Sequence, residues 1–214
     1  AGNLSERYDC IVFPSIGAST IIAGRAPDTT EPQYVGGIGS AGIVSLQNFV
    51  RNGGTLVCID ASTSLPVRHF NIPVKNALAG KPSSDFFCPG SILRVSVDNS
   101  HPVAWGMPEW VSGYFARSRA FDIIEPKKNG ADDPRAPETR YSTTVIARYS
   151  DTVLLQSGWI NGGEHIADKP AIVEVGYGDG HIVLLGFRVQ HRGHPHGTFR
   201  FLFNAMQRSV LENR

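Results

Sequence analysis

The feature that most constrains the fold of this chain is a strand, helix, strand pattern in its first sixty residues. Residues 8–15 form an apolar run with β-branched side chains that stops at Pro14 and Gly17, which predicts a buried inner strand. Residues 40–51 carry an apolar helical face and end at two glycines, and residues 55–60 form a second buried strand. A βαβ unit implies parallel strands with a right-handed crossover, so the first half of the chain is predicted to be α/β.

Strands dominate the prediction for the rest of the chain. The residues between the first strand and Gly39 are rich in Pro, Thr and Gly and predict a loop. Clean period-2 alternation over residues 91–98 predicts a strand with one wet face. The segment Tyr177-Gly-Asp-Gly180 has glycines suited to positive φ and predicts the turn of a hairpin. Strands are expected at 91–98, 144–149, 153–160, 170–176 and 181–186.

The chain is predicted to close on an amphipathic helix over residues 197–212. Its apolar stripe is expected to pack on the sheet, and consists of Phe199, Leu202, Phe203, Met206 and Val210. A charged, Pro-rich stretch, residues 125–140, is interpreted as an exposed excursion because the flanking strands look like partners in one sheet. Residues 1–214 are therefore predicted to form a single domain.

Charge and composition exclude several classes of function. Lys and Arg number 20 against 19 Asp and Glu, a net charge of +1, so we expect neither a nucleic-acid nor an anionic membrane partner. No apolar stretch approaches the roughly 18 residues that a spanning helix needs. The three cysteines, Cys10, Cys58 and Cys88, are odd in number and show no disulfide framework, which leaves the redox compartment undetermined.

A glycine-rich motif and a histidine-rich motif suggest cofactor or metal sites. The stretch from Gly37 to Gly42 matches G-x-G-x-x-G before a helix, but no strand runs into it, so we expect a close-packed turn and no cofactor. His191, His194 and His196 lie within six residues and could ligate a transition metal. No carboxylate or thiolate accompanies them in the sequence, so they are interpreted as polar loop residues and no metal is expected.

A third candidate is a nucleophile elbow, a strand that ends in a tight turn into a helix. Residues 55–60 followed by Ala61, Ser62 and Thr63 have that layout. The flanking glycines of an elbow are missing, and a hydroxyl after a strand often caps a helix. Cys58 lies inside the apolar strand, where a thiol is usually inert.

Several blocks together resemble a known family. They are 34–39, 49–57, 89–95, 98–102 with 106–108, and 186–190 running to 196–199 and 202–205. These blocks resemble the class I glutamine amidotransferase-like domain found C-terminal to bacterial zinc carboxypeptidases of the carboxypeptidase A type. The resemblance spans nearly the full length. It implies a flavodoxin-like three-layer sandwich with a mostly parallel central sheet and an added antiparallel hairpin.

The resemblance also locates a catalytic triad that this chain lacks. Class I amidotransferases use a Cys at the elbow and a His-x-Glu pair after a later strand. Here the nucleophile position is Ala61, or Ser62 if the turn is one residue longer, while Arg188 stands at the base and Gln190 at the carboxylate. Arg cannot act as a base at neutral pH and Gln carries no charge. The expectation is a non-catalytic accessory or binding domain that holds no cofactor.

The polar residues at the carboxyl edge of the sheet are the candidate ligand site, because open α/β folds bind ligands there. They are Ser15, Asp60, Ser62, Arg188 and Gln190. The resemblance further implies a parent zinc carboxypeptidase whose metal ligands lie upstream of Ala1 and whose peptidase domain is the natural partner. Because such enzymes are commonly exported, it implies a periplasmic or extracellular location.

Two alternatives stay open. A cryptic hydrolase or transferase would use Ser62 with a histidine of the 191–196 loop, and requires those groups within hydrogen-bond reach. An oligomerisation or docking module, similar to the amidotransferase-like trimerisation domains of some glycosidases, would self-associate through a large apolar patch. Trp105, Trp110 and Tyr114 are the candidates for that patch, or else anchor a long loop to the core.

Overall fold

The computed structural model describes residues 3–28, 30–124 and 141–212. The excursion expected at 125–140 lies outside these residues. Among the described helices, none is long and apolar enough to cross a membrane.

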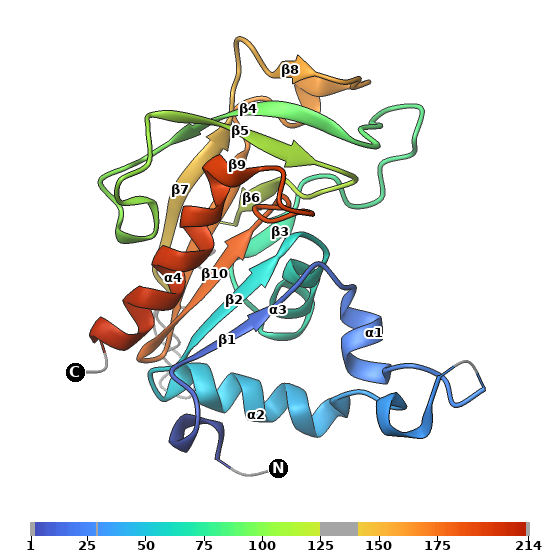
Figure 1. Ribbon diagram of the computed structural model, residues 1–214, viewed down its shortest axis with the longest axis vertical. Coiled ribbons are helices and arrows are strands. Elements are labelled where there is room, and N and C mark those ends of the chain that lie inside the picture. Colours follow the sequence, from blue (N-terminus) through green and yellow to red (C-terminus); the bar gives the residue numbers. More distant parts are fainter. Residues whose placement is uncertain (1–2, 29, 125–140, 213–214) are drawn as a thin grey trace, which may run out of the picture.

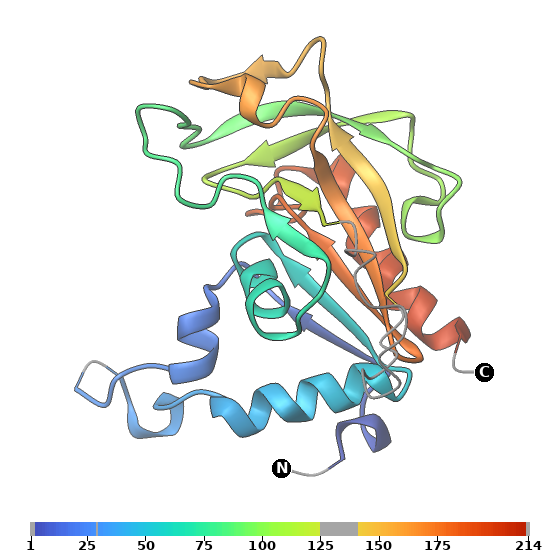
Figure 2. The same cartoon turned by 180° about the vertical axis from the view of Figure 1, so that it is seen from behind.

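The central element of the described structure is an eight-stranded sheet (Figures 1 and 2). Its order is β1 (Cys10–Phe13), β2 (Thr55–Ile59), β10 (Gly180–Leu185), β9 (Pro170–Tyr177), β7 (Thr143–Tyr149), β4 (Ser91–Val97) and β5 (Trp110–Phe115), with β8 (Leu155–Ser157) also paired to β4. A separate two-stranded sheet joins β3 (Val74–Asn76) to β6 (Phe121–Ile123). The strands that flank the excursion, β6 and β7, therefore lie in different sheets, contrary to expectation.

The sheet is mixed, so the prediction of a mostly parallel sheet was wrong. Only β1, β2 and β10 run parallel, and the pairs from β10 onward through β9, β7, β4 and β5 are antiparallel. Parallel neighbours need long crossovers, whereas antiparallel strands can follow one another through short connections, as β9 and β10 do. Figure 1 shows the consequence of the accumulated twist, since β4 and β5 run across the direction of β1, β2 and β10.

Helices cover both faces of the parallel strands, which confirms the α/β class. In β2, Leu56 and Cys58 pack in the core cluster that includes α2 (Gly39–Arg51), while Val57 and Ile59 pack in the cluster that includes α4 (Phe199–Glu212). This alternation follows from the two-residue period of a strand. The arrangement around β2 and β10 thus has three layers, and the antiparallel half is what departs from the flavodoxin-like expectation.

Three local predictions need correction. Strand β1 pairs only with β2 and is an edge strand, not an inner one. A short helix, α1 (Ala18–Ala23), occupies the predicted loop before Gly39, and β5 occupies a stretch taken as loop-rich. The strand expected at 153–160 is reduced to β8. Each difference depends on pairing or packing with a distant segment, which local composition does not encode.

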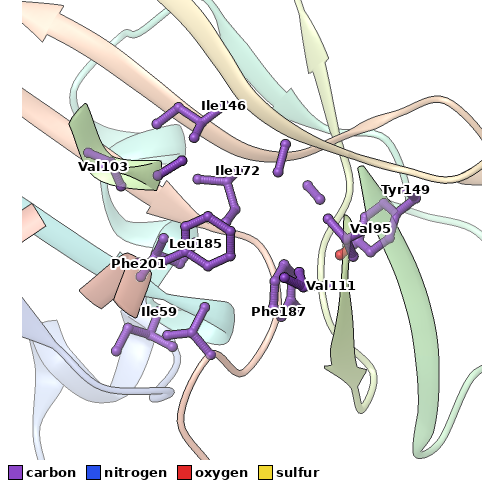
Figure 3. Close-up of a cluster of buried hydrophobic side chains, with 14 of the residues drawn as sticks. Ile59, Val95, Val103, Val111, Ile146, Tyr149, Ile172, Leu185, Phe187 and Phe201 are labelled. Atoms are coloured by element: carbon purple, nitrogen blue, oxygen red, sulfur yellow. The ribbon is translucent and has the colours of Figure 1, made fainter. Parts of the chain in front are cut away.

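The helix α4 packs on the sheet through a different stripe from the predicted one. Phe201, Ala205 and Ser209 are buried, whereas Phe203 and Met206 are exposed. Phe201 reaches the cluster around Leu185 and Ile59 (Figure 3). The small side chains of Ala205 and Ser209 let the helix backbone approach the strands closely, so a narrow stripe of one aromatic and two small residues forms the contact.

The remaining elements are short. The helix α3 (Ser64–His69) follows β2, and the predicted hairpin of β9 and β10 is confirmed, with Gly178 at φ +66° in its turn. Short 3-10 turns occur at Leu4–Glu6, Pro32–Tyr34, Asp60–Thr63, Pro102–Ala104, Gly163–His165 and His196–Thr198.

Candidate functional site

The carboxyl ends of the three parallel strands meet in one polar network. Ser15 follows β1, Asp60 follows β2 directly, and Arg188 follows β10. Ser15 Oγ donates a hydrogen bond to Asp60 Oδ2 at 2.7 Å, and Arg188 Nε donates to the same oxygen at 3.0 Å. The structure therefore brings together three of the five side chains proposed from the sequence as a ligand site.

Asp60 is the residue on which the network depends. Its φ of +52° lies in the left-handed region, and its side chain is nearly fully buried. Asp is among the few non-glycine residues that tolerate this conformation. A strained residue at the end of a strand is the geometry of an elbow nucleophile. The turn residue is thus Asp60, one position before the Ala61 to which the family resemblance assigned the nucleophile.

The carboxylate of Asp60 is balanced on one oxygen only. Oδ2 accepts from Ser15 and Arg188, while Oδ1 is buried and has no hydrogen-bond partner among the described residues. A buried charge needs a counter-charge, and the Arg188 guanidinium supplies it. Neither oxygen is open to an incoming substrate.

Ser62 does not take part in this network. Its side chain is fully buried, its Oγ accepts from the Ile59 backbone N–H at 2.8 Å, and the hydroxyl lies within 3.0 Å of the Phe13 and Ile59 carbonyl oxygens. A hydroxyl used this way closes the turn after β2 and stabilises the strand end. Within the described chain, no hydrogen bond joins Ser62 to an imidazole.

The two positions that replace the base and its orienting carboxylate are separated. Arg188 is bound to Asp60, whereas the side chain of Gln190 is exposed and makes no hydrogen bond to the network within the described chain. Thr198 Oγ1 donates to the backbone oxygen of Val189 at 2.8 Å and ties this segment to the start of α4. In the part of the chain that the structure describes, no base and no second carboxylate stand beside Asp60.

The three loop histidines do not form a metal site. The ring of His191 stacks on Tyr114, with centroids 4.8 Å apart, and the ring of His196 lies against Phe199. Burial lowers the pKa of His191, and the nearby charges of Arg188 and Arg192 lower it further. Nowhere in the described ranges do three or more His, Cys, Asp or Glu side chains lie close enough to hold a metal ion.

The candidate aromatic surface divides into two parts. Trp110 and Tyr114 line a groove together with the histidine loop, which the sequence had given no reason to connect with them. Trp105 is exposed, and its Nε1 donates to the Ser100 backbone oxygen at 3.0 Å. The alternation of Trp110, Ser112 and Tyr114 was the sequence signal that could have revealed both β5 and this groove.

The glycine-rich stretch serves packing. A Cβ atom on Gly37 would lie 2.5 Å from the backbone N of Gly24 and from the carbonyl oxygen of Ile22. Gly37 thus lets the segment before α2 approach the end of α1, which matches the role expected of a close-packed turn.

Comparison with known proteins shows likeness of fold alone. No family model matches the chain, and neither does any curated protein. A cytoplasmic protein of Salmonella typhimurium is similar with a TM-score of 0.52 at 19% identity, over 97% of this chain and 75% of that one. A β-galactosidase of Bacillus circulans sp. alkalophilus reaches a TM-score of 0.52 at 11% identity, over 98% of this chain and 24% of that one.

A third structure bears on the amidotransferase resemblance. A putative GMP synthase protein from Thermoplasma acidophilum matches with 14% identity over 81% of this chain and 66% of that one, at a TM-score of 0.44. That score is too low to carry an argument. Nothing in these comparisons links the chain to zinc carboxypeptidases, and what they establish is a mixed α/β fold shared with proteins of different activities.

Proposed function

We propose that this chain is a non-catalytic accessory domain that keeps an amidotransferase-like scaffold and binds a ligand or partner. Following the sequence resemblance, the proposal includes association with a zinc carboxypeptidase whose metal site lies outside this segment, in the periplasm or outside the cell. The observation that carries it is the Asp60–Arg188 pair, which occupies the elbow and the base position.

The chemistry of that pair supports a binding role over hydrolysis. Acyl transfer needs a nucleophile that can reach the substrate and a base that can take its proton. Asp60 is buried and held by two hydrogen bonds, and the guanidinium of Arg188 stays charged at neutral pH. A rigid polar cluster without an accessible nucleophile can position a ligand or a partner loop but cannot form an acyl intermediate.

The test for catalysis compares three proteins in two assays. Ammonia release from glutamine and hydrolysis of p-nitrophenyl acetate are measured for the wild type, Ser62→Ala and Asp60→Asn. We expect all three to stay at the buffer rate. Turnover by the wild type that disappears in Ser62→Ala would establish the hydrolase alternative and overturn the proposal.

The association with a peptidase is tested separately on the full translated reading frame. Zinc content and release of C-terminal residues from peptides should be found there and should be absent from residues 1–214 alone. A reading frame without zinc and without carboxypeptidase activity would remove this part of the proposal and leave the non-catalytic part standing.

One observation favours a second candidate, the oligomerisation module. Phe203, Met206 and Val210 on α4 are 56%, 41% and 42% exposed and follow the 3 and 4 spacing of a coiled-coil seam. Such a stripe on a surface helix is typical of a contact with another helix. The likeness to about a quarter of a β-galactosidase chain suits a module that is carried by larger proteins.

A further inference from the structure

A groove with a volume of about 980 Å³ opens next to the Asp60 network. Its floor is the outer face of the paired strands β4 and β5, and its wall is the loop of residues 191–197. The two sites adjoin because the Arg188 backbone N–H donates to the Tyr114 carbonyl oxygen at 3.2 Å. The groove is large enough for a drug-sized molecule and is lined mainly by apolar and aromatic groups.

The floor of the groove places aromatic side chains where a sheet normally exposes polar ones. Ile92 pairs with Tyr114 in register, and Trp110 lies on the same face two and four residues before Ser112 and Tyr114. The alternate residues of both strands point into the core. Trp110 remains 43% exposed although the guanidinium of Arg94 lies 4.3 Å from its ring centre. Flat apolar surface is therefore available to a ligand.

The wall of the groove is held in place by its own contacts. Thr198 Oγ1 donates to the Val189 backbone oxygen, and the stacked rings of His191 and Tyr114 join the loop to the floor. A groove whose walls are fixed before a ligand arrives costs little ordering entropy on binding.

The charge of the groove has one sign. No Asp or Glu is among its described lining residues, whereas Arg192 and three imidazoles are. Within the described chain, no carboxylate forms an ion pair with Arg192. Arg192 also has a φ of +49°, in a turn closed by the hydrogen bond from His194 N to His191 O. That backbone conformation disfavours Arg, so the fold places a cation at the groove rim at some cost.

From these features we propose that the groove binds an organic anion with a flat aromatic body. The ring stacks on Trp110 and Tyr114, and the carboxylate or phosphate pairs with the guanidinium of Arg192, whose planar fork fits either group. This ligand site is distinct from the Asp60 network and goes beyond the proposed accessory role.

Isothermal titration calorimetry with small probes tests the proposal at pH 7.5. Indole-3-acetate and phenyl phosphate carry the two anionic groups, tryptamine offers a similar ring with a cation, and lactose is a neutral sugar. We expect at least one anion to bind at least tenfold more tightly than tryptamine or lactose, and the tighter anion identifies the preferred group. Binding of tryptamine or lactose as tight as that of both anions, or no binding of any probe up to millimolar concentration, would overturn it.

Three variants locate the binding. Arg192→Met should weaken the anion at least tenfold and leave tryptamine unchanged, and Trp110→Ala should weaken every ring-bearing probe. Arg117→Met is the matched control, since Arg117 is also exposed, has a φ of +52° and lies outside the groove. Equal losses in Arg117→Met and Arg192→Met would contradict the assignment. Circular dichroism on each variant confirms that the protein remains folded.

Discussion

Arg188 Nε donates a hydrogen bond to Asp60 Oδ2 across 3.0 Å and thereby joins two residues 128 positions apart in the sequence. The contact links the end of β10 to the end of β2, and Ser15 after β1 completes it. In a fold that elsewhere carries a nucleophile and a base at such an edge, this chain has a buried ion pair. The pair stabilises the strand ends instead of activating an attacking atom.

Removing the arginine should destabilise the protein. Arg188→Met leaves the Asp60 carboxylate buried without a counter-charge, and since Arg188 is about one third exposed we expect a loss of about 2 to 3 kcal/mol, the lower end of the range for broken buried pairs. Urea unfolding at pH 7 measures this. The double variant Asp60→Asn with Arg188→Met should lose less than the sum of the single changes. A loss no larger than that of Arg117→Met would contradict the prediction.

The Ser62 hydroxyl should matter for stability and not for turnover. Ser62→Ala removes the acceptor of the buried Ile59 N–H, which predicts a loss of about 1 to 3 kcal/mol in the free energy of unfolding. Ser19→Ala, on an exposed position of α1, is the control and should change it little. Unchanged stability of Ser62→Ala in thermal unfolding would show that the hydroxyl does not hold the turn.

A buried charge cluster behind α4 should make stability depend on acid. Burial raises the pKa of Glu174, but hydrogen bonds from His101 and His181 and the charge of Arg208 outweigh it, so its pKa lies well below the usual range. These three groups face the carboxylate from the turn at 102–104, from β10 and from α4. A carboxyl whose folded pKa is depressed stabilises the fold above its unfolded pKa.

The expected result is full stabilisation above about pH 5 and a progressive loss as the pH falls below the ordinary Glu value of about 4.3. Glu174→Gln should be less stable at pH 7 and should flatten the dependence between pH 5 and pH 3. Urea unfolding across this range, with Glu109→Gln as the exposed control, checks it. Parallel pH profiles for Glu174→Gln and the wild type would refute the assignment.

The exposed stripe of α4 should mediate self-association if the chain is an oligomerisation module. Sedimentation velocity at micromolar concentrations should show an oligomer for the wild type and a monomer for Phe203→Glu with Met206→Lys, because charges in an apolar helix seam are desolvated without partners. Val44→Glu, an equally exposed apolar position on α2, should leave the oligomer intact. A monomeric wild type at these concentrations would exclude this second candidate.

The cysteine thiols should resist modification in the folded protein. Burial raises the pKa of Cys10 to about 11 and places that of Cys58 higher still, so little thiolate exists at pH 8. Burial also raises the pKa of Cys88. Dithionitrobenzoate should label none of the three rapidly in buffer and all three in 6 M guanidinium chloride. Fast labelling of the native protein would show that the strand ends open readily.

The sequence carried the parallel core well because its signals are local. The apolar run at 55–60, the amphipathic pattern at 40–51 and the Gly-Asp turn of the last hairpin each follow from residue type and spacing, and all three elements are present. Edge or inner position is not a local property, since β1 and β2 have similar apolar runs and differ only in whether a second strand pairs with them. The antiparallel half was underestimated for the same reason.

The candidate site divides in the same way. Residue types and the expected carboxyl edge suffice to nominate Ser15, Asp60 and Arg188, because parallel strands end together. Only the tertiary structure decides that Asp60 takes the positive φ, that Ser62 turns inward to the backbone, and that α4 buries Ala205 while exposing Phe203. Backbone conformation at a strand end and the choice between two helix faces are determined by the energy of packing many distant groups at once, which no single stretch of sequence contains.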